Sequence, residues 1–202
     1  MNKYDQEYYF IHWPMTDNKD IPSLQSDSAT SMRAYDYEVQ PTGDAPLVFT
    51  NSWRERNRKV GVKEYIGDIL FEGFNVLVRD RIREALLQYD LPGLQINPAV
   101  YIDDQDKWHE DFWFLTFFQR FDCWDRKTSI YTDEPLEGGG MKIYPVEKIH
   151  LDASVLDKVP LEKRLLFKMG STVDGFVTVH QSLLPLFRKG RSGAEFFSVS
   201  DF

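Results

Sequence analysis

Cysteine is almost absent from this chain, because Cys123 is the only one among 202 residues. A single thiol excludes an intramolecular disulfide and the paired Cys-x-x-Cys motifs that hold structural zinc. No segment approaches the ~20 consecutive apolar residues of a membrane span, and the N-terminus lacks the apolar core of a signal peptide. We therefore expect a cytoplasmic protein without a membrane partner.

Positive charge is also scarce, because 24 Lys and Arg residues face 32 Asp and Glu residues and the net charge is -8. Binding to nucleic acid or to an anionic membrane surface requires clustered positive charge, so we expect neither partner. The one basic segment, 54–59, is predicted to be an exposed loop or helix face that offsets nearby acids. Hydrophobic residues make up 42% of the chain and aromatic residues 15%, which predicts a packed core.

An internal repeat is the most informative pattern. The first copy spans Gly73–Pro98 and the second spans Gly175–Val199. In each copy an alternating strand leads into a helix, then a glycine, and then a second strand. The matched pairs are Val76 and Val177, Val78 and Val179, Ile82 and Leu183, Leu86 and Phe187, Gly93 and Gly193, and Ile96 and Phe196. The pattern predicts an α+β fold with a mixed, mostly antiparallel sheet and two similar strand–helix–strand units.

Aromatic and β-branched runs predict further strands. They lie at residues 7–14, 34–40, 98–103, 112–121, 142–152 and 164–170. Polar or glycine-rich segments at 16–30 and 137–142 are predicted to be a loop and a flexible turn. We expect one domain over residues 1–202, within which residues 1–65 could form an N-terminal subdomain.

The segment "WHEDFWFLTFFQRFDCWDRKTS", residues 108–129, combines an aromatic run with residue types that occur in catalytic and metal sites. A nucleophilic Cys123 would need a base beside it, and none of the four histidines has a local pattern that links it to this thiol. We expect Cys123 to be a small buried hydrophobe. Asp122, Asp125 and Ser129 directly follow the strand and are predicted to fix a tight turn through hydrogen bonds to the backbone. We therefore predict no catalytic residue, cofactor or metal site.

The acidic segment 103–111 has carboxylates at alternate positions, as calcium loops do, but it lacks the glycine of that motif. It is predicted to be a solvated hairpin loop between two strands. If a partner has a basic surface, exposed carboxylates here would steer its association. The candidate partner-binding residues are Asp103, Asp104, Asp106, Glu110 and Asp111.

An aromatic strand that runs into "FDCWDRKTS" resembles the central motif of a family of predicted immunity proteins from bacterial polymorphic-toxin systems, formerly a domain of unknown function. Residues 165–197 resemble the end of that family and residues 76–101 its middle, so the resemblance covers roughly residues 70–202. The shared motifs are hydrophobic patterns with few fixed polar residues. Asp122, Asp125 and Ser129 match the motif.

The resemblance implies a protein that binds and blocks a cognate toxin, such as one delivered by contact-dependent or type VI secretion. It implies no enzymatic activity and no cofactor. Two alternatives stay open from the residues alone: an enzyme that uses carboxylates and histidines in a pocket, such as His109 with Glu110, and a structural or adaptor domain. The sequence leaves open the toxin, the interface and the oligomeric state.

Overall fold

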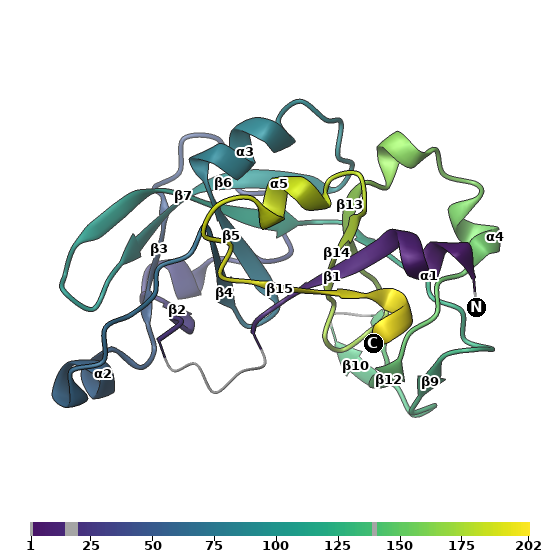
Figure 1. Cartoon of the computed structure of the whole chain (residues 1–202), viewed down its shortest axis with the longest axis horizontal. Coiled ribbons are helices and arrows are strands. Elements are labelled where there is room, and N and C mark those ends of the chain that lie inside the picture. Colours follow the sequence, from purple (N-terminus) through teal and green to yellow (C-terminus); the bar gives the residue numbers. More distant parts are fainter. Residues whose placement is uncertain (1, 15–19, 139–140) are drawn as a thin grey trace.

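The computed structural model describes residues 2–14, 20–138 and 141–202, and it confirms the predicted α+β class. Two larger sheets and two small two-stranded sheets are joined by short helices (Figure 1). Helices α3 (Asp80–Leu86) and α5 (Leu184–Arg188) lie side by side, whereas α1 (Lys3–Glu7) and α4 (Ala153–Leu156) lie at the opposite end of the molecule from α2 (Arg54–Val60). Within the described residues, no helix is long and apolar enough to cross a membrane.

The five-stranded sheet has the order β15-β1-β14-β13-β8. Its strands are β15 (Glu195–Ser198), β1 (Tyr8–His12), β14 (Val177–His180), β13 (Leu166–Met169) and β8 (Arg120–Phe121). All neighbours are antiparallel except β13 and β8, which run parallel.

The six-stranded sheet has the order β2-β3-β6-β7-β5-β4. Its strands are β2 (Leu24–Ser26), β3 (Leu47–Asn51), β6 (Leu94–Ile102), β7 (Trp108–Phe117), β5 (Asn75–Arg79) and β4 (Ile69–Glu72). The sheet curls so far that its two edges meet, because Ser23 beside β2 forms a bridge with Phe71 on β4. Among the described strands of this sheet, β3 and β6 pair in parallel and the other neighbours are antiparallel; the Ser23–Phe71 bridge is also parallel.

The remaining elements are short. The small sheets pair β10 (Leu136–Gly138) with β11 (Met141–Ile143) and β12 (Val146–Lys148) with β9 (Ile130–Tyr131). Three 3-10 turns complete the chain: η1 (Thr30–Met32), η2 (Leu161–Lys163) and η3 (Val199–Asp201).

The two predicted strand–helix–strand units are confirmed, and they share one topology. In the first unit β5, α3 and β6 enclose the antiparallel strand β7; in the second, β14, α5 and β15 enclose β1. Register supports the sequence match, since Ile96 pairs with Leu115 on β7 and Phe196 pairs with Ile11 on β1. The inserted strand follows its unit in the sequence in one case and comes from the N-terminus in the other. The units are therefore related by a circular permutation.

Three apolar clusters hold these layers together. The first joins both units between the sheets and contains Ile82, Leu86, Leu183 and Phe187 from α3, α5 and the turn before α5. The second lies on the other face of the five-stranded sheet and includes Trp124. The third fills the interior of the curled six-stranded sheet with aromatic and aliphatic side chains. Both faces of the five-stranded sheet are thus covered, which accounts for the nearly continuous apolar runs in its strands.

Several boundaries differ from the sequence-based expectation. Residues 34–40 form turns and irregular structure instead of a strand: Tyr35 is buried in the interior of the six-stranded sheet, Ala34 and Asp36 are half-buried, and residues 37–39 are exposed. Segment 98–103 is not a separate strand but continues β6, with Pro98 inside it. The basic segment, residues 54–59, lies in helix α2.

Residues 1–65 contribute β1 to one sheet and β3 to the other instead of packing as a unit of their own. Parts of the predicted loop and glycine turn, residues 16–19 and 139–140, lie outside the described residues.

Candidate functional site

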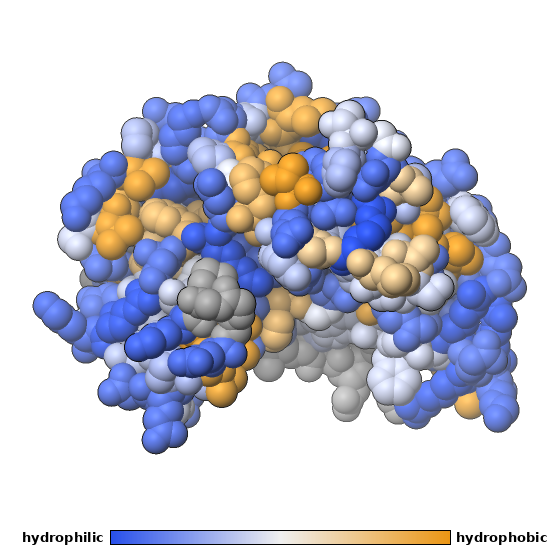
Figure 2. Space-filling model, turned by 180° about the vertical axis from the view of Figure 1, so that it is seen from behind, coloured by the Kyte–Doolittle hydropathy of each residue, from blue (hydrophilic) through white to orange (hydrophobic). Residues whose placement is uncertain are grey.

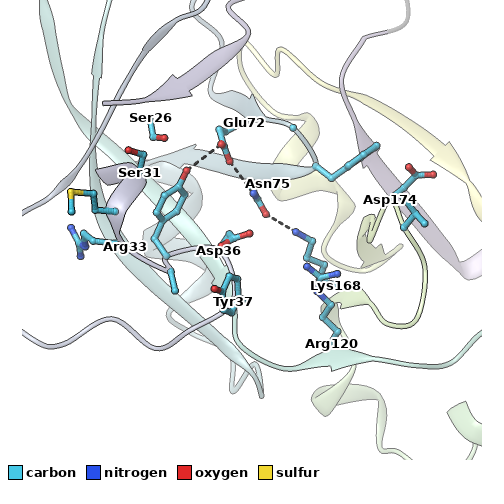
Figure 3. Close-up of a pocket in the computed structure, with 16 residues that line it drawn as sticks. Ser26, Ser31, Arg33, Asp36, Tyr37, Glu72, Asn75, Arg120, Lys168 and Asp174 are labelled. Carbon is cyan, nitrogen blue, oxygen red and sulfur yellow. Dashed lines mark hydrogen bonds between the residues drawn. The ribbon is translucent and has the colours of Figure 1, made fainter. Parts of the chain in front are cut away.

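A cleft of about 620 Å3 lies where the two sheets meet (Figure 3). One wall is the turn between β4 and β5, residues 72–75, and another is the segment 31–37 around η1. Strands β13 and β8 supply Lys168 and Arg120, and the turn before β14 supplies Val173 and Asp174. The turns of the two repeat units, β4–β5 and β13–β14, therefore both line this cleft.

Lys168 is the least expected residue of the cleft, since its side chain is only 3% exposed. Its Nζ donates a hydrogen bond of 2.5 Å to Oδ1 of Asn75, a neutral acceptor. Burial and, to a smaller extent, the nearby Arg120 cation lower the pKa of Lys168 to about 8, against the opposing effect of Asp36 and Glu72. The ammonium is thus mostly protonated at neutral pH, although its environment disfavours the charge.

Arg120 lies beside Lys168 on the neighbouring strand, where the two residues are register partners. Neither cation forms an ion pair with a carboxylate within the part of the chain that the structure describes. Gly175 makes room for both, because a Cβ at this position would lie 3.2 Å from Arg120 Nη1 and 3.3 Å from Lys168 Cε. The floor of the cleft therefore carries two adjacent cations without a direct ion pair among the described residues, and the carboxylates of Asp36 and Glu72 act on Lys168 only from a distance.

Carboxylates line the other walls of the cleft. Glu72 is engaged at both oxygens, by the hydroxyl of Tyr35 at 3.1 Å and by the amide of Asn75 at 2.9 Å. Asp36 and Asp174 are half-buried on separate loops. Burial raises the pKa of the Asp174 carboxyl, and the charge of His12 partly opposes that shift. The hydrogen-bonded chain from Tyr35 through Glu72 and Asn75 to Lys168 fixes the cleft wall (Figure 3).

Exposed apolar side chains surround this polar floor. Met32 is 89% exposed, Tyr37 55%, Phe74 42% and Val173 38%, and all four line the cleft. They come from three separate segments of the chain. On the face opposite to that of Figure 1, hydrophilic side chains predominate and apolar side chains gather in a few separate patches (Figure 2). Exposed apolar groups that line a cleft together are typical of a binding surface.

The acidic segment is a hairpin loop, as predicted, but the interpretation of it as fully solvated was wrong. Asp103 is 4% exposed and Asp104 is 2% exposed. The Asp104 carboxylate accepts hydrogen bonds from the side-chain amides of Asn51 and Asn57. The Asp103 carboxylate accepts a bond of 2.9 Å from His109 and two from backbone N–H groups of its own loop. These two acids stabilise the β6–β7 loop and leave no carboxylate oxygen on the surface for a partner.

The other three acids of this segment remain on the surface. Asp106 adopts a left-handed backbone conformation at the loop tip and forms ion pairs with Arg54 and Arg58 of α2. These contacts confirm that the basic segment offsets nearby acids. Asp111 pairs with Arg79, and Glu110 is exposed.

We predict that the Asp103 contacts make stability depend on acid pH. Burial raises the pKa of this carboxyl, but the hydrogen bonds from His109 and the loop backbone outweigh burial and hold the pKa below its usual value of 3.8. A carboxyl with a lowered pKa stabilises the fold at pH values above its unfolded pKa, and this contribution disappears as pH falls through the folded pKa.

Asp103→Asn should therefore reduce the free energy of unfolding at pH 5, and the difference in free energy between variant and parent should shrink below pH 3.8. Urea unfolding from pH 5 to pH 2.5 measures this, with the exposed Asp133→Asn as control. A pH-independent difference would contradict the assignment.

The segment after β8 is a tightly bonded turn. Oδ1 of Asp125 accepts a bond of 2.8 Å from the backbone N–H of Lys127, and Oγ of Ser129 accepts one of 2.9 Å from the backbone N–H of His150. Asp122 pairs with Arg126 and accepts a bond of 2.9 Å from Ser171. These contacts join the turn to the strands around it.

Cys123 is fully buried in the second apolar cluster, where its sulfur lies 3.9 Å from that of Met169. Burial raises the pKa of the thiol, so the thiolate needed for nucleophilic chemistry is disfavoured. We expect Cys123→Ser to lower the free energy of unfolding by about 1–3 kcal/mol, because it buries a hydroxyl among apolar groups. Partner binding should persist, and Cys123→Ala serves as the matched control. Loss of binding by a folded Cys123→Ser protein would show that the thiol has a direct role.

Comparisons with known proteins add no further assignment. Neither the scan against protein-family models nor the search of curated proteins finds a match. Among the described residues no group of three or more His, Cys, Asp or Glu side chains is arranged to hold a metal ion.

The cleft residues were not predicted from the sequence. Lys168 lies inside the predicted strand "RLLFKMG", where a single lysine in an otherwise apolar run is the one available signal. A charged residue between Phe167 and Met169 on a covered strand must either be buried or mark an opening in the layer above it. Here both hold. Asn75 and Arg120, which lie beside Lys168, are distant from it in the sequence, so no local pattern could identify them.

Proposed function

We propose that this protein is an immunity protein that binds a cognate toxin and blocks it by direct contact, using the surface around the cleft. The observation that carries the binding part is the set of four exposed apolar side chains that line a cleft with a charged floor: Met32, Tyr37, Phe74 and Val173. The resemblance of residues 70–202 to predicted immunity proteins supports the toxin as partner. Cytoplasmic localisation follows from this proposal, because an immunity protein meets an incoming toxin inside the cell that it protects.

The chemistry of the cleft surface suits tight protein recognition. Stable interfaces bury about 800 Å2 on each partner, and a few central anchors contribute most of the binding energy. Aromatic side chains are favoured as anchors because they bury a large area at low entropic cost. Tyr37 and Phe74 are two such aromatic side chains, and they lie on different walls of the cleft. Arg120 adds a guanidinium that has no intramolecular ion pair among the described residues.

The acidic hairpin remains a second contact region in this proposal, reduced to its exposed members Asp106, Glu110 and Asp111. A basic toxin surface would be steered by these charges, which mainly change the association rate and its salt dependence. Asp106 and Asp111 are already paired with arginines, so their net field is weaker than the sequence suggests. We therefore assign the main contact to the cleft.

The test is co-expression with the protein encoded by the neighbouring open reading frame. The proposal expects a complex that survives size-exclusion chromatography, and protection of cells from that protein's toxicity. Without a complex, or without protection by a folded protein, the immunity assignment fails.

A further inference from the structure

The floor of the cleft has an arrangement of charge that folding alone does not explain. Lys168 and Arg120 are register partners on adjacent parallel strands. Like charges on neighbouring strands are destabilising. Burying an ammonium whose hydrogen-bond acceptor among the described residues is a neutral amide costs further free energy. An apolar pair at these positions would extend the surrounding cluster at no such cost.

We infer that Lys168 and Arg120 form a binding site for a single carboxylate group at the floor of the cleft. A guanidinium and an ammonium side by side can take one carboxylate oxygen each, or the guanidinium can bind both oxygens while the ammonium adds a third bond. Gly175 keeps the space beside both cations free of a side chain. The ligand would contact both cations directly, whereas among the described residues Asp36 and Glu72 act on Lys168 only from a distance.

The walls of the cleft limit the charge of the ligand. Asp36, Glu72 and Asp174 also line the cleft, and they would repel a multiply charged anion. A singly charged carboxylate fits two cations in such surroundings, whereas a phosphate dianion would meet stronger repulsion. Two sources can supply this group: a free small carboxylate, or an Asp or Glu side chain of a bound protein.

The first experiment uses the free protein, so it does not depend on the proposed function. Protein with 13C-labelled lysine is titrated with acetate at constant ionic strength, and Lys168→Met assigns the Lys168 side-chain resonance. We expect a saturable shift of this resonance, and the pKa of Lys168 should rise in saturating acetate because a neighbouring anion favours the charged form. Arg120→Gln should weaken acetate binding about tenfold or more, and Asp36→Asn should strengthen it.

Two controls make the titration decisive. The resonance of the exposed Lys59 should show no saturable shift, and inorganic phosphate should bind more weakly than acetate. If acetate shifts Lys168 and Lys59 alike, or if folded Arg120→Gln binds acetate as well as the parent does, there is no such site. Tighter binding of phosphate than of acetate would overturn the ligand class.

The same titration on the complex with the neighbouring gene product distinguishes the two sources of the carboxylate. If a partner side chain supplies it, the partner shifts the Lys168 resonance stoichiometrically and acetate no longer binds. If the source is a free carboxylate, acetate still binds in the complex. Both results require the acetate site in the free protein. A complex without any acetate site refutes this inference and leaves the immunity assignment intact.

Discussion

Phe187→Ala should lower the free energy of unfolding by about 3–5 kcal/mol, and Leu86→Ala by about 2–5 kcal/mol. Both side chains are buried in the cluster between the two sheets, at 0% and 1% exposure. Because they occupy matched positions in the two repeat units, each truncation removes the equivalent part of one helix from a common core. Urea unfolding monitored by circular dichroism measures both values.

The adjacent residue Leu87 provides the matched control. It is 54% exposed, so Leu87→Ala should change the free energy of unfolding by about 0.5 kcal/mol or less. The double variant of Leu86 and Phe187 tests whether the core is shared. Since α3 and α5 are in contact, the two losses should be coupled by about 0.5 kcal/mol or more. Two separate unfolding transitions, or strict additivity, would indicate two independent cores.

Replacement of both Tyr37 and Phe74 by alanine should weaken the toxin complex at least 100-fold, which corresponds to about 2.7 kcal/mol. Both side chains project at the cleft rim, and truncation of central aromatic anchors commonly costs 2 kcal/mol or more each. Phe74 also contacts Phe176 at a ring distance of 5.4 Å, so a small loss of stability is expected as well. Isothermal titration of the folded variant with the toxin separates the two effects.

Two controls locate the interface. Tyr89 is 41% exposed and lies outside the cleft, so Tyr89→Ala should leave the affinity unchanged. Trp108 is 58% exposed and belongs to the strand that leaves the acidic hairpin. If Trp108→Ala weakens binding and the cleft variant does not, the contact surface is the hairpin and the proposed location is wrong.

The parts of the fold that have a local periodicity of hydrophobic residues could be predicted from the sequence. The units around Val76 and Val177 were recognised because strand and helix periods survive in both copies. The inserted strands were not recognised as equivalent, although "YYFI" at residues 8–11 and "FWFL" at residues 112–115 occupy matching register positions. Their places in the chain differ by the permutation, so a comparison at constant offset cannot align them.

The residues of the candidate site could not be predicted from the sequence, for a different reason. Carboxylates in "DDQDKWHED" look solvated because charged residues usually are, yet Asp103 and Asp104 are buried and held by partners as distant in sequence as Asn51 and Asn57. Lys168 and Asn75 meet only because the two sheets pack together. Pairs of this kind are products of tertiary structure, and no single segment encodes them.

Hydrogen–deuterium exchange of the protein alone and in complex with the neighbouring gene product tests the central claim most directly. We predict slower exchange in the complex at residues 31–37, 72–75 and 173–174, the three segments that surround the cleft, and little change at 103–111. Protection confined to the acidic hairpin or to a face remote from the cleft, or the absence of any complex, would contradict the account.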